Sequence, residues 1–300
     1  MIAFAAIHQS RTGVPSLQSK ADQHHARCVQ LLINLGDDEV RAPDGVALAA
    51  VCLLRSYEIL AEDFDPNRHL SGAYALAASQ HVDFSIPSLS RAGFFNYLRE
   101  DITFSLMTRK PLKLDSERID TFYPAVTDED QLNVASLHLA RIINVAFSNG
   151  LSQNEGEFLS EQLEKWRGTL PQYFQPYHES NASSDSVFPS IWMLAECHAS
   201  VAHYYIVAKS ILRAYVQAER HPLAHLQPLA ARLCGIAFTY DRPSVLVNWF
   251  GPVCFCGRFL YEKSLQVELV RRLQGCRRET GWPVQRFVED LQRHWDDETG

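Results

Sequence analysis

The residues of this chain that could do chemistry gather in positions 192–215, WMLAECHASVAHYYIVAKSILRAY. Glu196, His198, His203 and Tyr204 carry side chains that transfer protons or bind metal ions in other proteins. The two histidines are five positions apart, about 140° around a helix, so a single helix face does not offer both of them to one metal ion. Glu196 shares a face with His203, but side chains stacked along one helix do not converge as a catalytic triad does.

The apolar residues of the same stretch favour a structural interpretation. Trp192 starts a run of apolar residues at three- and four-residue spacing, and a second such run lies on another face. A helix that is apolar on two faces is buried on both. We therefore expect one buried helix over 190–217, with Trp192 in the core and His203 hydrogen-bonded internally.

A further candidate lies in residues 93–106, GFFNYLREDITFSL. Arg99 sits beside an apolar stripe of Phe95, Leu98, Ile102 and Leu106, which indicates that its side chain is partly buried. A buried guanidinium must meet a carboxylate or main-chain carbonyl groups. We expect a structural ion pair at Arg99, with a ligand site as the alternative.

Metal and cofactor sites are not predicted. His24 and Cys28 are spaced for one face of a helix, but no second pair completes four ligands, and Cys254 and Cys256 point apart on a helix. The sequence has no phosphate-binding loop, dinucleotide fingerprint, nucleophile elbow or zinc-protease motif. We expect no metal, no cofactor and no enzymatic activity.

Composition narrows the class of protein. The 28 Lys and Arg against 35 Asp and Glu give a net charge of −7, which disfavours direct binding to nucleic acid. Seven cysteines without regular spacing indicate a reducing compartment rather than a disulfide framework. The longest apolar run, residues 45–54, is about half of a membrane span. We expect an intracellular protein that does not associate with membranes.

Helical periodicity dominates the rest of the chain and predicts an all-α fold, an irregular bundle of about ten helices in a single domain, 1–300. Ser152 followed by Glu155 has the spacing of a capping box, and Asp44 is a further helix-start residue. Residues 171–190 are predicted as a loop. The expected helices are 20–35, 46–61, 70–79, 91–108, 129–147, 153–167, 190–217, 225–240, 244–273 (with a break near Gly257) and 283–296.

Several segments occur in a recognisable order: AAVCLLRSYEIL (49–60), RHLSGAYAL (68–76), FFNYLREDITFSLMTRKPLKLD (94–115), residues 192–215, CGIAFTYDRPSVLVNWFGPVCFCGRFL (234–260) and ETGW (279–282). In this order they resemble the regulatory region, or middle homology region, of fungal zinc-cluster transcription factors. The resemblance covers about residues 20–295. It implies an all-helical regulatory domain in the nucleus that controls gene expression, with secondary-metabolite or nutrient pathways as typical targets.

The resemblance also implies partners: transcription-machinery or other regulatory proteins, a small-molecule effector and a second copy in a homodimer. The family binds DNA through a six-cysteine zinc cluster, whereas none of the seven cysteines here forms a C-x-x-C pair. We therefore expect no DNA-binding domain in this chain. The alternative is a stand-alone helical protein that binds or converts a small metabolite. Its ligand would meet Arg99, Glu196, His198, His203 or Tyr204.

Overall fold

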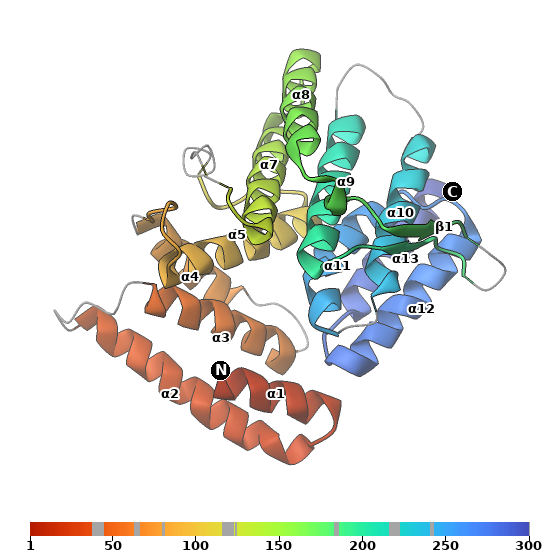
Figure 1. The fold of residues 1–300 in the computed structure, drawn as a ribbon. Coiled ribbons are helices and arrows are strands. Elements are labelled where there is room, and N and C mark those ends of the chain that lie inside the picture. The colour runs from red at the N-terminus through yellow and green to blue at the C-terminus, as the bar shows by residue number, and fades with distance from the viewer. Residues whose placement is uncertain are drawn as a thin grey trace. The chain divides into compact units, whose positions relative to one another are not determined.

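The computed structural model describes residues 1–37, 45–62, 67–79, 82–115, 123, 125–182, 186–215, 223–240 and 243–299 (Figure 1). Over these residues the chain forms twelve α-helices and one short two-stranded sheet, which confirms the predicted all-α fold. The chain divides into two compact units, and the division falls within two of the helices. Whether the two units act as one domain stays a prediction.

Unit 1 comprises Met1–Asp101 and Cys276–Val284. Its first helix packs against the second and third, and the third packs against the fourth. A cluster of three aromatic rings, Phe84, Phe94 and Phe95, fills part of its core. The helices are α1 (Ile2–Thr12), α2 (Gln18–Asp37), α3 (Val46–Glu62), α4 (Arg68–Ser79) and the start of α5 (Leu89–Thr108), with a 3-10 turn at Pro15–Leu17.

Unit 2 comprises Ile102–Gly275 and Gln285–Gly300. In Figure 1, α7 and α8 stand beside α9, and α10 and α11 pack against each other and against α9. The α-helices are α7 (Asp128–Asn149), α8 (Gln153–Thr169), α9 (Glu196–Tyr215), α10 (Gln227–Thr239), α11 (Pro243–Gly257), α12 (Lys263–Thr280) and α13 (Gln285–Thr299). Short 3-10 helices lie at Gln172–Phe174 and Leu223–Leu226.

Most predicted helices are present close to their expected bounds. The predicted stripe on α5 is buried along its length, and Ser152 forms the predicted capping box with Glu155 at the start of α8. The break near Gly257 is also confirmed, since α11 ends at that residue and α12 begins at Lys263. Helix α1 was not expected, and Asp44 lies outside the described residues.

The predicted helix over 190–217 was wrong at its start. A strand, β2 (Ser190–Trp192), pairs antiparallel with β1 (His178–Ser180), and α9 begins only at Glu196. The amide of Ile191 donates to the Thr239 hydroxyl at 2.9 Å, and this side chain from α10 holds the strand extended. Gly235 lets the hairpin approach α10, because a Cβ there would stand 2.5 Å from the Pro189 carbonyl oxygen.

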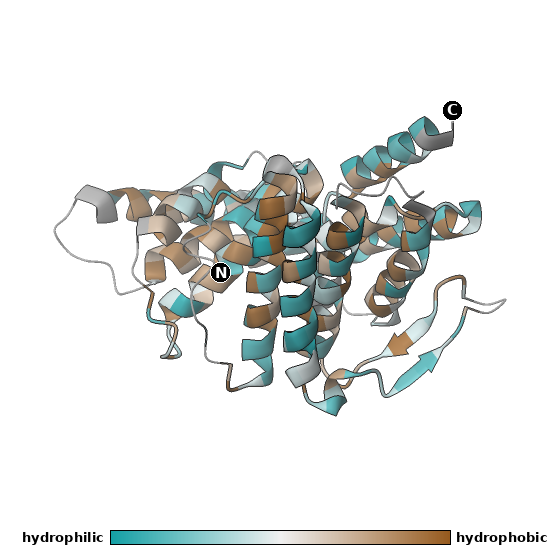
Figure 2. Ribbon diagram, turned by 90° about the horizontal axis from the view of Figure 1, so that it is seen from above, coloured by the Kyte–Doolittle hydropathy of each residue, from teal (hydrophilic) through white to brown (hydrophobic). Residues whose placement is uncertain are grey.

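The hairpin exposes one strand more than the other. In Figure 2 one arrow is hydrophilic and the other largely hydrophobic, which matches the exposed β1 and the buried Ile191 of β2. Trp192 ends β2 with 41% of its side chain exposed, so the prediction that it lies in the core was wrong. Among the described residues of unit 2, the buried tryptophans are Trp249 of α11, at 2%, and Trp295 of α13, at 5%.

The seven cysteines are all free thiols, and five of them are buried. Cys28 in unit 1 and Cys197 in unit 2 are half-buried. Burial raises the pKa of Cys254 and of Cys256 to about 12, so these thiols stay protonated and act as small apolar core residues. Among the helices that the structure describes, none combines the length and the apolar character that crossing a membrane requires.

Candidate functional site

The residues selected from the sequence fall in both units. Arg99 belongs to unit 1, whereas the other four lie on α9 in unit 2. On α9, His198, His203 and Tyr204 are buried, and Glu196 is exposed in the first turn. Glu196 and His203 therefore lie in different environments, although both were expected on one helix face.

His203 is fully buried and stacks on the indole of Trp249, with ring centroids 4.4 Å apart. Neither imidazole nitrogen has a hydrogen-bond partner of normal geometry, although the Leu233 main chain lies close enough to the ring to act on it as a weak hydrogen-bond partner. Burial lowers the pKa of His203 to about 3, and the Leu233 main chain opposes this shift. The ring is therefore neutral at pH 7 and is a very weak base.

His198 connects α9 to the first residue of α7. Its Nε2 lies 2.9 Å from the Oδ2 of Asp128, and the Tyr173 hydroxyl donates to the Oδ1 of the same carboxylate at 3.0 Å. The hydrogen bond from His198 holds the pKa of Asp128 below its usual range. The neighbouring Cys197 has a raised pKa because it is partly buried beside Glu129 and Asp128. A protonated thiol beside this pair does not make a Cys–His nucleophile.

Arg99 is half-buried, as its place beside the apolar stripe of α5 indicates, and a more deeply buried cation among the described residues of unit 1 is Arg55. The Nε of Arg55 donates to a carboxylate oxygen of Glu100 at 2.8 Å. Sequence reasoning missed Arg55, although a signal was present. Arg55 continues the spacing of Leu48 and Cys52 along the buried face of α3.

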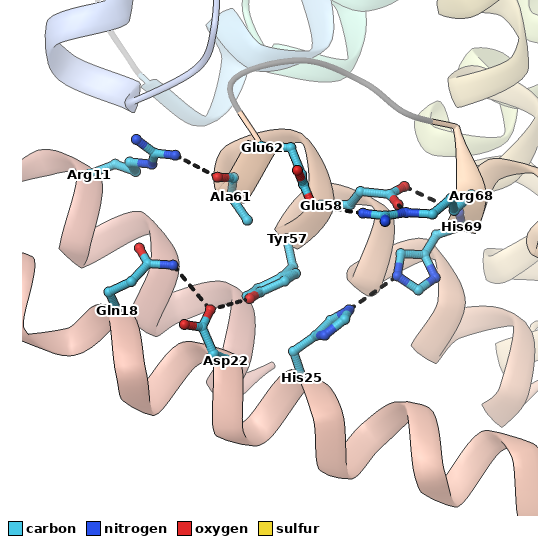
Figure 3. A network of polar contacts seen from close by, with 10 residues as sticks. All are labelled: Arg11, Gln18, Asp22, His25, Tyr57, Glu58, Ala61, Glu62, Arg68 and His69. Carbon is cyan, nitrogen blue, oxygen red and sulfur yellow. Dashed lines mark hydrogen bonds and ion pairs between the residues drawn. The ribbon is translucent and has the colours of Figure 1, made fainter.

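A polar network in unit 1, drawn in Figure 3, was also missed. At its centre Glu58 of α3 is buried, and its carboxylate accepts from the Arg68 Nε at 2.6 Å and from the His69 amide at 3.2 Å. Arg68 also pairs with Glu62 at 2.8 Å. One buried carboxylate thus holds the first turn of α4, where free amides and the helix dipole favour negative charge.

The same network joins α2 to α4 through two imidazoles. The Nε2 atoms of His25 and His69 lie 3.2 Å apart, with ring centroids 5.4 Å apart, so the rings point nearly end to end. His25 stacks on Tyr57 at 4.3 Å, and the Tyr57 hydroxyl donates to Asp22 at 2.6 Å. One imidazole must donate and the other accept, so the contact fails when both Nε2 atoms carry protons.

Burial lowers the pKa of both His25 and His69, against the opposing charge of Glu58. Both rings are therefore neutral at pH 7. Arg11 of α1 completes the network by donating to the carbonyls of Leu60 and Ala61 at the end of α3, each at 2.7 Å. The network therefore links four helices through polar contacts. Its two imidazoles, His25 and His69, can take up protons under acid conditions.

The described residues contain no group of three or more His, Cys, Asp or Glu side chains that is placed to hold a metal ion. Comparisons of the chain with models of protein families, with curated proteins and with solved structures gave no match. A proposal about function therefore rests on the residues of this chain alone.

Proposed function

We propose that this chain is the regulatory domain of a fungal zinc-cluster-type transcription factor that controls a secondary-metabolite or nutrient pathway. The observation that carries the proposal is the order of the motif segments along the chain. What supports it further is that these segments include the buried helices α3, α5, α9, α10 and α11. A domain of this kind acts in the nucleus through protein partners or a small effector, and reaches DNA through a zinc cluster carried elsewhere.

The titratable groups of the core support a non-enzymatic role. The imidazole of His203 has a pKa of about 3, and the buried Cys254 and Cys256 have pKa values of about 12. A catalytic base is most effective with a pKa near the operating pH. These three groups are held in place by packing and by contacts between helices. None of them has a pKa near the operating pH.

A tethering experiment tests the proposal. The chain is fused to an unrelated sequence-specific DNA-binding domain and expressed in a fungal host with the matching reporter gene. We expect reporter output to differ several-fold from that of the DNA-binding domain alone, in the activating or repressing direction. A fusion that carries Trp249→Ala, which removes a buried ring, is the control for a folded domain. Equal output of the intact fusion and of the bare DNA-binding domain refutes the proposal.

A second candidate function is a stand-alone protein that binds or converts a small metabolite. Three buried nitrogen atoms without a hydrogen bond of normal geometry favour it: Nδ1 and Nε2 of His203 and Nε1 of the stacked Trp249. Buried polar atoms of this kind normally meet a partner or a water molecule. Replacement His203→Gln separates the two functions. If the variant melts like the wild-type chain and its host loses a metabolite, the result favours the second candidate. If the host's metabolites are unchanged and the output of the reporter gene is altered, the result favours the first.

A further inference from the structure

A pocket of about 400 Å³ lies between α12 and α13, and the residues that line it all belong to unit 2. These residues follow the three- and four-residue spacing of one face on each helix. They include Lys263, Gln266, Val267 and Val270 of α12, with Trp295 and Asp296 of α13. Small-molecule sites have volumes of about 300–1,000 Å³, so this pocket has room for a small ligand.

Gln266 gives the pocket a fixed hydrogen-bond acceptor. Its residue is only 6% exposed, and its Nε2 donates to the Leu260 carbonyl at 2.8 Å. A carbonyl oxygen only accepts, so the nitrogen of the amide must face Leu260 and the side-chain oxygen is left over. No described residue donates to this Oε1, and protein atoms do not enclose it completely. A ligand in the pocket can therefore supply the missing donor.

The pocket also contains one charge of each sign. Lys263 is exposed at the start of α12, and its ammonium forms no ion pair with a residue that the structure describes. Asp296 lines the same pocket from α13. Opposite charges on two walls of one pocket attract a molecule that carries both an anion and a cation.

The remaining walls are apolar. Val267 is 59% exposed and Val270 is half-buried, and both lie on the pocket face of α12. On the opposite wall the Trp295 Nε1 donates to the Gly257 carbonyl at 3.1 Å, so the polar atom of this indole is already paired and the ring is fixed. An apolar group placed here removes the valine side chains from water.

An α-amino acid with an apolar side chain presents a carboxylate, an ammonium donor and an apolar body in one small molecule. We propose that the pocket between α12 and α13 binds a free amino acid of this kind. Its carboxylate lies at Lys263, and its ammonium lies at Asp296 and the Gln266 oxygen. The apolar side chain packs on the two valines and the indole.

The inference goes beyond the proposed function, because the contacts that carry it do not depend on whether the chain regulates transcription. The purified chain is tested directly, so failure to bind an amino acid leaves the reporter experiment unaffected. The reverse also holds, since a silent reporter fusion says nothing about this pocket.

Calorimetry with the purified chain compares three amino acids, L-leucine, L-methionine and L-phenylalanine, with two analogues. The analogues are 3-phenylpropanoate, which lacks the ammonium, and 2-phenylethylamine, which lacks the carboxylate. We expect at least one amino acid to bind saturably with a Kd on the order of 0.1–1 mM. Both analogues should bind at least tenfold more weakly than that amino acid, because each of them meets only one of the two charges.

Variants connect the binding to the pocket. Lys263→Met removes the ammonium and keeps an apolar stem, and it should weaken binding of the amino acid at least tenfold. Asp296→Asn should weaken it severalfold. Lys165→Met, at an exposed position of α8 in the same unit, is the matched control and should change nothing.

Thermal melting checks that each variant is folded, and if Lys263→Met melts early, Asp296→Asn decides. Three results would each overturn the proposal. They are absence of saturable binding by all three amino acids up to about 10 mM, binding of both analogues as tightly as the amino acid, and unchanged binding in both pocket variants.

Discussion

The imidazole of His203 lies almost flat on the indole of Trp249, at an interplanar angle of 29°. This contact places a titratable ring in the middle of unit 2, where no described side chain compensates a positive charge on it. Protonation in the folded chain is therefore costly. The contact links the stability of unit 2 to pH.

His203 should make the chain acid-sensitive. Its pKa is about 3 in the folded chain and about 6.5 in the unfolded chain, so below pH 6.5 the unfolded chain binds a proton that the folded chain does not. The free energy of unfolding is highest above pH 6.5. It should fall towards pH 3 by about 1.4 kcal/mol per pH unit from this group.

His203→Phe tests this linkage, because it keeps an aromatic ring on Trp249 but takes up no proton. We expect a change of less than about 1.5 kcal/mol at pH 7 and a shallower loss of stability between pH 6 and 4. His178→Phe, at an exposed position of β1, is the control. Urea midpoints at several pH values measure both, and a variant that keeps the wild-type slope contradicts the prediction.

Trp249 and Trp192 should differ strongly in their contribution to stability. Trp249→Ala removes a ring from a packed core and should cost about 3–5 kcal/mol. Trp192→Ala removes a ring that is 41% exposed and should cost about 1 kcal/mol. Chemical denaturation of the two variants gives the comparison. Similar losses would show that Trp192 is packed more tightly than its exposure indicates.

The buried carboxylate of Glu58 predicts a measurable effect for its partner. Arg68→Ala leaves that carboxylate without its cation and should lower the melting temperature of unit 1, because an uncompensated buried charge is costly. The loss should be moderate, because Arg68 itself is 65% exposed and water screens the pair. Arg271→Ala breaks an exposed pair with Glu268 and should cost less than about 0.5 kcal/mol. Equal effects in thermal melting would argue against the role of Glu58.

The capping box of α8 offers a test of a residue found from the sequence. The Ser152 side chain accepts from the Glu155 amide, and the Glu155 carboxylate accepts from the Ser152 amide at 3.1 Å. Ser152→Ala should lower the free energy of unfolding by about 1 kcal/mol. Ser152→Asp keeps an acceptor and should retain most of it. Loss of stability in both variants, measured by urea titration, would assign the effect to something other than capping.

Local signals explain which parts of the fold could be predicted. Helical periodicity and caps act within a few residues, so α5, α7 and α8 were placed to within two residues at each end. The start of α9 could not be placed in this way. Trp192 and Ala195 continue the helical spacing by coincidence, while Thr239 and Tyr240, over 40 positions away, hold 190–193 extended.

The polar groups depend even more on distant contacts. His25 meets His69 from 44 positions away, and Asp128 meets His198 from 70 positions away. Neither pair has a spacing that a reader of the sequence could recognise. The paired, buried position of Arg55 could have been predicted from the sequence, because a charged residue on the buried face of an apolar helix requires a partner.

The two half-buried cysteines offer a practical consequence. Cys28 belongs to unit 1 and Cys197 to unit 2, while the other five thiols are enclosed in the core. A maleimide dye pair applied to the native protein should therefore attach one fluorophore to each unit without any engineered site. Energy transfer between the dyes then reports the distance between the units in solution. Repeating the measurement after a candidate protein or small molecule is added would show whether its binding changes that distance.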